Sequence, residues 1–272
     1  MNDKYCFDIP DEGTSPHNIL DYCFNKSTED FLLKSGLMPG MNVLELGCGA
    51  GSMSCWIAQR IGPKGHLVAI DNDPAQLSRA QIHAEQNDIH NLSFACQDAD
   101  DISKREAQFD LVYCRFILHH LERPRDVIAQ MISLLKPGGI IAIEEGIVNH
   151  AFVYPHQESF GNERFTITDH HINTEGQQRD GNFGIKLYHT LHRAGISDLS
   201  LNLVAPVLTT RDEKSLLLSG HQYSKRSQIE HGVTEEQWQH RLNEMKQFII
   251  DDSVIVGFYQ SAQVHGVKSK KQ

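Results

Sequence analysis

The sequence predicts an α/β fold, a doubly wound and mostly parallel sheet with helices on both faces. Two observations predict it. Between residues 42 and 145, short apolar runs of strand length alternate with segments whose apolar residues recur at helical spacing. Each segment between two runs is long enough to hold a helix, which a crossover between parallel strands requires. Both faces of such a sheet are therefore expected to be buried.

Length and composition favour a single globular domain across residues 1–272. Hydrophobic residues make up 40% of the chain and charged residues 22%, which is typical of a protein with a full core. The net charge of −10 disfavours a nucleic-acid partner, because binding to phosphates needs basic surface. No apolar run approaches the roughly 18 residues of a membrane span, so no membrane partner is expected. The six cysteines form no CxxC pair and the first residues no signal pattern, so we expect reduced thiols in a cytoplasmic protein.

The first half of the chain contains five predicted strands, preceded by a helix over about residues 16–34. The strands are predicted at residues 42–46, 66–70, 92–96, 109–114 and 140–143. The helices between them are predicted at residues 52–61, at residues 74–86, and from residue 124 to the Lys-Pro-Gly-Gly sequence at 136–139. Pro74 suits the first position of a helix, where no N–H partner is needed.

The pattern changes after residue 146. Residues 147–182 are rich in His, Asn, Asp and aromatic residues without periodicity, which is typical of a lid or binding loop. Beyond them, regular elements are predicted as a helix at 184–194, strands at 199–207 and 254–264, and inserted helices between 211 and 250. Thr234 opens a capping box, and apolar residues follow it at helical spacing: Trp238, Leu242, Met245 and Ile249.

The glycine-rich stretch from Val43 to Ser52 is the predicted centre of a binding site. Three glycines follow a buried strand, where the backbone is able to approach a ligand closely. A dinucleotide-binding turn has a third glycine where this chain has Ser52. It also gains nothing from an acid such as Glu45 near a pyrophosphate. A dehydrogenase is therefore the least favoured interpretation, and the flanking residues must decide.

At these flanks the chain resembles the class I S-adenosylmethionine-dependent methyltransferases. Residues 45–51 (ELGCGAG) resemble their first motif, and Asp71, 20 residues after Gly51, resembles their ribose-binding acid. Three further segments are similar to later motifs of the family: Asp98-Ala99, the fourth strand at 109–112 with Leu-His-His-Leu at 118–121, and the turn at 134–139. The resemblance covers about residues 40–145.

The resemblance implies a Rossmann-like sheet of seven strands, mostly parallel, with the last strand antiparallel. It also implies a helical and loop cap over the acceptor site. The single domain would then begin with an N-terminal arm and helix (residues 1–36), followed by a cofactor-binding core (residues 37–146). Two insertions would line the acceptor site (residues 147–182 and 208–250).

The cofactor implied by the resemblance is S-adenosyl-L-methionine, with S-adenosyl-L-homocysteine as the product. Asp71 would hold the ribose hydroxyls, Glu45 the ammonium directly or through water, and Asp98 the adenine amine. Each acid also has a structural alternative: Asp71 as a turn residue, Glu45 as a buried structural group, and Asp98 as a helix cap. The full predicted cofactor-binding set is Glu45, Gly47, Cys48, Gly49, Gly51, Ser52, Met53, Asp71, Asn72, Gln76, Asp98, Ala99, Cys114 and Arg115.

Methyl transfer needs alignment of the acceptor, and a general base where the acceptor must lose a proton. His119 and His120, just past the fourth strand, are the candidate catalytic residues, and a structural role is the alternative for each. The candidate acceptor-binding residues lie in the first insertion: Tyr154, His156, His170 and His171. In methyltransferases that act on quinone precursors, a Glu, Glu and His site binds metal where Phe116, His119 and His120 stand here, so no metal is predicted.

The predicted function is transfer of a methyl group to a small-molecule acceptor. Two alternatives stay open, a methyltransferase that acts on protein or RNA, and a cofactor-binding regulator without turnover. The acidic balance of the chain disfavours RNA. Nothing in the sequence identifies the acceptor or the atom that is methylated.

Overall fold

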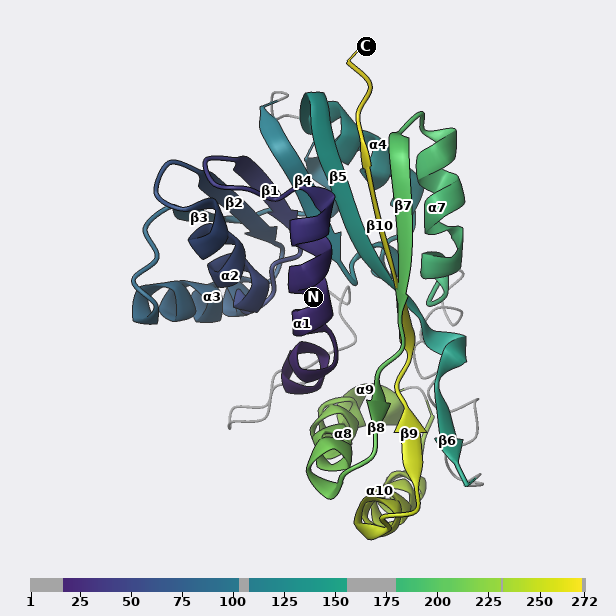
Figure 1. Cartoon of the computed structure of the whole chain (residues 1–272). Coiled ribbons are helices and arrows are strands. Elements are labelled where there is room, and N and C mark those ends of the chain that lie inside the picture. Colours follow the sequence, from purple (N-terminus) through teal and green to yellow (C-terminus); the bar gives the residue numbers. More distant parts are fainter. Residues whose placement is uncertain (1–16, 103–107, 156–179, 231, 271–272) are drawn as a thin grey trace. The chain divides into compact units, whose positions relative to one another are not determined.

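The computed structural model describes residues 17–102, 108–155, 180–230 and 232–270, and these residues fold into two compact units (Figure 1). Of the described residues, the sheet unit comprises 26–102, 108–146, 183–203 and 261–270. The helical unit comprises 17–25, 147–155, 180–182, 204–230 and 232–260. None of the described helices is long and apolar enough to cross a membrane.

The sheet unit is built on a seven-stranded sheet in the order β3-β2-β1-β4-β5-β10-β7. Its strands are β1 (Asn42–Leu46), β2 (His66–Asp71), β3 (Leu92–Cys96), β4 (Phe109–Arg115), β5 (Leu135–Ile147), β7 (Ser197–Val204) and β10 (Gln260–Val267). The first five strands pair in parallel, and the last strand runs antiparallel, as predicted. The carboxyl ends of β1, β2 and β4 therefore meet at one edge of the sheet.

Helices cover both faces of this sheet (Figure 1). They are α1 (His17–Ser35, of which residues 26–35 belong to this unit), α2 (Ser52–Ile61), α3 (Pro74–Gln86), α4 (Pro124–Leu134) and α7 (Phe183–Arg193). Successive side chains of β4 point to opposite faces. Leu111 and Tyr113 pack with apolar residues of α1 and α2, whereas Val112 and Cys114 pack with those of α4 and α7. Two separate cores result, which confirms the doubly wound architecture.

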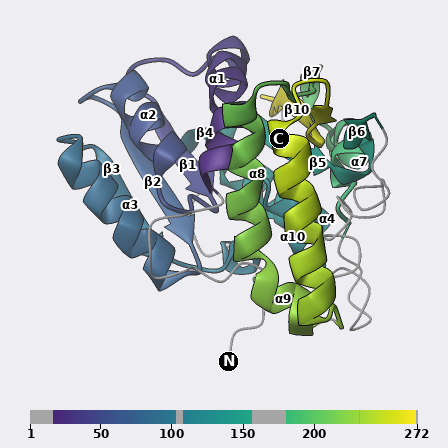
Figure 2. The same ribbon diagram turned by 90° about the horizontal axis from the view of Figure 1, so that it is seen from below.

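In the described residues, the helical unit combines a three-stranded sheet with α8, α9, α10 and the first residues of α1. The strands are β6 (Phe152–Tyr154), β8 (Val207–Leu208) and β9 (Ile255–Gly257), in the order β6-β9-β8 with both pairings antiparallel. The helices are α8 (Arg211–Tyr223), α9 (Lys225–Glu230) and α10 (Glu235–Ile250), and α8 packs beside α10 (Figure 2). The capping box at Thr234 and the burial of all four predicted apolar residues of α10 are confirmed.

The second half of the chain differs from the prediction in how its strands are divided. The strand predicted at 199–207 ends at Val204 in β7, and β8 starts after Pro206, whose carbonyl accepts a hydrogen bond from Phe258 N–H (2.9 Å). The strand predicted at 254–264 is likewise divided into β9 and β10. A proline cannot donate to a sheet ladder, so the chain leaves one sheet and enters the other there.

Strand β5 is also longer than predicted at both ends. It includes Gly138 and Gly139, which exchange backbone hydrogen bonds with Lys268 next to β10 (both 2.9 Å). At its other end it continues through two buried acids, Glu144 and Glu145, which the prediction had placed after the strand. Pairing with neighbouring strands therefore outweighs the local turn preference of glycine.

Lys214 is fully buried in the helical unit and satisfies three backbone carbonyls. Its Nζ donates to the carbonyls of Phe248 (3.3 Å), Asp251 (2.6 Å) and Val254 (3.1 Å), at the end of α10 and before β9. A buried ammonium is tolerated only where its donors are paired. Lys214 therefore fastens α8 to the end of α10.

Replacing Lys214 with methionine is expected to lower the free energy of unfolding of this unit by about 3 kcal/mol, because three backbone carbonyls each lose a hydrogen bond from a charged donor. Urea denaturation followed by fluorescence measures the change. In a Trp56→Phe background Trp238, on α10, is the remaining tryptophan of the chain and reports on the helical unit alone. Lys246→Met, at an exposed position of α10, is the matched control and should change stability little. Equal effects of the two substitutions would contradict the assignment.

Candidate functional site

The glycine-rich turn between β1 and α2 is fastened to the end of β2. Gly47, Gly49 and Gly51 all have positive φ angles (69°, 51° and 81°). The N–H groups of Gly47 and Cys48 both donate to the carbonyl of Ile70 (2.8 and 3.0 Å). The turn thus takes a conformation that other residues adopt only at a cost, and two strands hold it in place.

Two of these glycines also allow close packing. A Cβ atom on Gly47 would lie 1.9 Å from Cδ1 of Ile117, in the loop after β4, and one on Gly51 would lie 2.9 Å from Cβ of Ala80 on α3. Gly51 is the residue before the first turn of α2. The loop after β4 therefore lies directly against the glycine turn, and α2 starts against α3.

Asp71 ends β2 and joins the glycine turn to the start of α3. Its side chain is buried, and its Oδ2 accepts a hydrogen bond from Gly49 N–H (2.8 Å) while Oδ1 accepts one from Asp73 N–H (3.0 Å). Burial raises the pKa of the Asp71 carboxyl, and these backbone hydrogen bonds oppose the rise. A carboxylate has about four acceptor positions, so Asp71 retains the capacity to accept from a ligand hydroxyl.

Glu45 lies inside β1, two residues before the first glycine. Its side chain is 3% exposed and accepts a hydrogen bond from the Ser54 hydroxyl on α2 (2.5 Å). Burial raises the pKa of Glu45 to about 7, which the nearby charge of Arg115 opposes. Glu45 therefore has a structural partner and also carries an ionisable charge close to the glycine turn.

A second buried carboxylate, Glu144, lies on the same face of the sheet as Glu45. It accepts hydrogen bonds from the side chains of Thr28 on α1 (2.6 Å), Ser261 (2.7 Å) and Gln263 (3.1 Å). Burial raises the pKa of Glu144, and Arg115 opposes the rise. The Arg115 guanidinium donates to the Thr28 hydroxyl (3.2 Å), and the Thr28 hydroxyl in turn donates to Glu144. Arg115 is therefore linked to this buried acid through Thr28. Asp110, at the start of the same strand β4, pairs with Lys136 (2.7 Å).

The other predicted cofactor residues of the sheet unit lie around the same edge. Asp98 accepts a hydrogen bond from Asp100 N–H (3.1 Å) and so caps a short 3-10 helix that starts at Ala99. Met53 and Cys114 are buried, and burial raises the pKa of the Cys114 thiol. Three further predicted residues are partly buried at the starts of α2 and α3: Ser52, Asn72 and Gln76.

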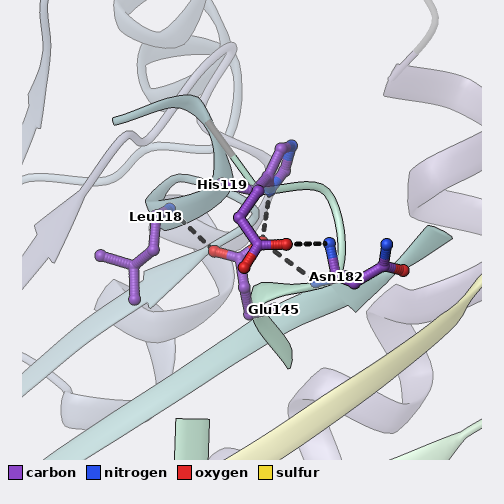
Figure 3. Close-up of polar contacts among 6 residues, drawn as sticks. Leu118, His119, Glu145 and Asn182 are labelled. Atoms are coloured by element: carbon purple, nitrogen blue, oxygen red, sulfur yellow. Dashed lines mark hydrogen bonds and ion pairs between the residues drawn. The ribbon is translucent and has the colours of Figure 1, made fainter. Parts of the chain in front are cut away.

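His119 is held by Glu145 (Figure 3), a residue that the sequence did not single out. His119 lies in the 3-10 helix Leu118–His120 after β4, and Glu145 lies in the neighbouring β5. The Glu145 carboxylate accepts from Nδ1 of His119 and from the N–H groups of Leu118 (2.7 Å) and Gly146 (3.0 Å). The pair forms because β4 and β5 are neighbours in the sheet, and no local pattern in the sequence signals it.

His120 lies beside His119, with ring centroids 3.9 Å apart, and is partly buried. Of the predicted acceptor-binding residues, Tyr154 is 67% exposed at the end of β6 in the helical unit. The others, His156, His170 and His171, lie outside the described residues. A role in acceptor binding for both insertions stays a prediction.

Comparison with known protein sequences gives matches of two kinds. Residues 37–195 match the family model described as "Methyltransferase domain". The chain is 32% identical over 103 residues to the ubiquinone biosynthesis O-methyltransferase of Coxiella burnetii, a match that covers 38% of this chain and 42% of that protein. The matched segment is thus less than half the length of this curated relative.

Two solved structures share the fold. The phosphoethanolamine N-methyltransferase 2 of Haemonchus contortus, in complex with phosphomonomethylethanolamine and S-adenosylhomocysteine, has a TM-score of 0.59 at 16% identity, over 94% of this chain and 58% of that one. The [4+2]-cyclase SpnF has a TM-score of 0.57 at 18% identity, over 90% of this chain and 80% of that one. A fold that hosts both a transferase and a cyclase does not by itself determine the reaction.

Proposed function

Since the chain belongs to the class I S-adenosylmethionine-dependent methyltransferases, we propose that it transfers a methyl group from S-adenosylmethionine to a small-molecule acceptor. One observation carries the proposal. Asp71 is buried at the end of β2 and bonded to the glycine turn, so a ligand at this edge of the sheet would meet a carboxylate and an open backbone together.

The residues of this edge fit the chemistry of the cofactor. Asp71 offers acceptors for the two ribose hydroxyls, and the glycine turn admits a ligand to the backbone. Glu45 offers a buried negative charge for an ammonium group. Asp98 and the Ala99 backbone follow β3 next to Asp71 and would hold the adenine.

When bound, S-adenosylmethionine supplies a methyl group that is already activated by its positive sulfur. The protein then has to hold the acceptor in line with the methyl group and to accept a proton where the acceptor carries one. His119 is the side chain best placed for the second task, because its loop lies against the glycine turn through Ile117.

A small-molecule acceptor is favoured by two facts. The net charge of −10 disfavours RNA, and the relative that matches at 32% identity is named for ubiquinone biosynthesis. The acceptor is to be identified with a panel of small molecules.

Isothermal calorimetry with S-adenosylmethionine and S-adenosylhomocysteine tests the cofactor. We expect binding of both with micromolar or tighter affinity, and absence of binding would overturn the proposal. Incubation with a panel of phenols, amines and thiols, followed by mass spectrometry for S-adenosylhomocysteine and methylated product, tests turnover. Tight binding without product across the panel would instead favour a cofactor-binding regulator.

The affinity for S-adenosylmethionine is expected to fall as the pH is lowered from about 7 to about 5, a range in which the α-amino group of the cofactor is already charged. The ammonium group needs Glu45 ionised, and the pKa of Glu45 is about 7 in the free protein, so each step of acidification protonates more of it. Calorimetry at a series of pH values measures the change, and Glu45→Gln should remove most of it. An unchanged affinity in the wild-type protein would contradict the role of Glu45.

The stability of the free protein should respond to pH in the opposite sense. Because burial raises the pKa of Glu45 above its ordinary value of 4.5, the folded state favours the protonated form. The contribution of Glu45 to stability is therefore complete below about pH 4.5 and is lost as the pH rises through 7.

A further inference from the structure

The pair formed by His119 and Glu145 has a chemical consequence for the methyl acceptor. We propose that Glu145 is a positioning residue that holds His119 with a proton on Nδ1, so that Nε2 accepts a proton from the acceptor. The acceptor would then be a compound with a hydroxyl or N–H group at the site of methylation. This inference rests on the proposed function and specifies its acceptor class.

The backbone around Glu145 favours a carboxylate that accepts hydrogen bonds. The side chain is fully buried, and two backbone N–H groups donate to its two oxygens, Leu118 N–H to Oε2 and Gly146 N–H to Oε1. Nδ1 of His119 lies within hydrogen-bond distance of Oε1 (Figure 3). Two backbone donors, one on each oxygen, favour the charged form of the carboxyl group, and a carboxylate then accepts from Nδ1–H of His119. Hydrogen bonds to the charged form are also the stronger ones.

An ionised Glu145 determines the tautomer of His119. Nδ1 must carry the proton that it donates, so in a neutral ring Nε2 has a free lone pair. Within the described part of the chain, Nε2 of His119 has no hydrogen-bond partner, and the side chain is 11% exposed. Nε2 of His119 is therefore able to accept a proton from a ligand, whereas Nδ1 is bonded to Glu145.

The same carboxylate also sets the position of the loop. Glu145 binds the backbone of Leu118 with one oxygen and the ring of His119 with the other. Ile117, the preceding residue, lies where a Cβ on Gly47 would be. His119 is therefore held at the carboxyl end of β4, next to the glycine turn, where ligands of an open α/β sheet bind.

The neighbouring acid shows that this arrangement is specific to one face of the strand. Glu144 is equally buried, but it points to the other face and is bonded to hydroxyl and amide groups of Thr28, Ser261 and Gln263. Successive strand residues point to opposite faces, so one residue of register separates a structural carboxylate from one that orients a histidine.

The proposed step is a proton transfer coupled to methyl transfer. As the acceptor oxygen or nitrogen forms its bond to the methyl carbon, the carbon–sulfur bond breaks with its electron pair passing to sulfur. The acceptor proton moves to Nε2 of His119 and later to water. The resulting imidazolium is stabilised by the negative charge of Glu145, which keeps its own bond to Nδ1–H.

The tautomer is measured directly by NMR on the free protein, without any acceptor. In protein labelled with ¹⁵N-histidine, long-range proton–nitrogen correlation distinguishes a protonated Nδ1 from a protonated Nε2, and the loss of signals in His119→Asn assigns the residue. We expect His119 to be protonated on Nδ1 in the wild-type protein and in Glu144→Gln, and to lose this preference in Glu145→Gln. A protonated Nε2 in the neutral wild-type ring would overturn the proposal.

The acceptor class is measured with the same variants. Phenols and amines from the panel should be methylated by the wild-type enzyme, and Glu145→Gln should lower kcat by about 10- to 100-fold with little change in the KM for S-adenosylmethionine. Glu145→Asp should recover part of the loss. A nitrophenol that is already ionised at the assay pH should lose much less, because no proton has to be removed.

Three results would overturn the inference while leaving the proposed function intact. They are an equal loss in Glu144→Gln and Glu145→Gln, an equal loss for the phenol and the ionised nitrophenol, and turnover restricted to acceptors without a transferable proton. Failure of the wild-type protein to bind S-adenosylmethionine would instead overturn the proposed function. His119→Asn and Glu145→Gln are expected to bind it as the wild-type protein does, so binding tests the proposed function separately from the role of this pair.

Discussion

Asp71→Ala is expected to weaken the binding of S-adenosylmethionine by about 100-fold or more. Two hydrogen bonds from ribose hydroxyls to a carboxylate are each expected to contribute about 1.5–3 kcal/mol, and about 1.4 kcal/mol corresponds to a tenfold change in affinity. The substitution also removes the acceptor of Gly49 N–H and Asp73 N–H, so the glycine turn loses a bond that shapes it. Both effects weaken binding.

Asp73→Ala is the matched control for this measurement. Asp73 caps α3 by accepting from Ala75 N–H (2.8 Å), and its loss should cost about 1 kcal/mol of stability with little effect on affinity. Calorimetry gives the affinity of each variant and circular dichroism confirms that it is folded. A folded Asp71→Ala protein with wild-type affinity would exclude Asp71 from the cofactor site.

Gly47→Ala is expected to lower the free energy of unfolding by about 3 kcal/mol or more and to abolish cofactor binding. Two costs combine. The φ angle of 69° is unfavourable for a residue with a Cβ, by about 1–2 kcal/mol, and the new Cβ would lie 1.9 Å from Ile117 Cδ1. The Ile117 side chain must shift to relieve this clash, and overpacking adds about 1–3 kcal/mol.

Gly40→Ala separates the two costs. Gly40 has a φ angle of 86°, and no other group lies within 4 Å of the position that a Cβ would take there, so alanine should cost only the conformational part. In the double variant Gly47→Ala with Ile117→Ala, the clash is removed and part of the stability should return. Chemical denaturation of the wild-type protein and these variants measures the differences. If Gly40→Ala and Gly47→Ala were equally destabilising, contact with Ile117 would not be the reason for glycine at position 47.

The first half of the chain could be predicted closely because its signals are local. The predicted bounds of α2, α3, β1 and β3 agree with the structure to the residue. Glycine marks both ends of α2 and the end of β1, and Pro74 marks the start of α3. Beyond residue 146 the same rules were less informative. Pro206 divides a predicted strand between two sheets, and which sheet each half joins depends on pairing partners that are distant in sequence.

The sequence by itself determined the glycine turn, the acids at the ends of β1, β2 and β3, and with them the cofactor family. These residues are signalled by their distance from a strand end. Only the tertiary structure decided that Glu145 holds His119, that Glu144 faces Thr28, and that Lys214 serves the end of α10. The partners in these contacts lie at least 26 residues apart, and the face on which a strand side chain lies depends on register, which no local pattern specifies.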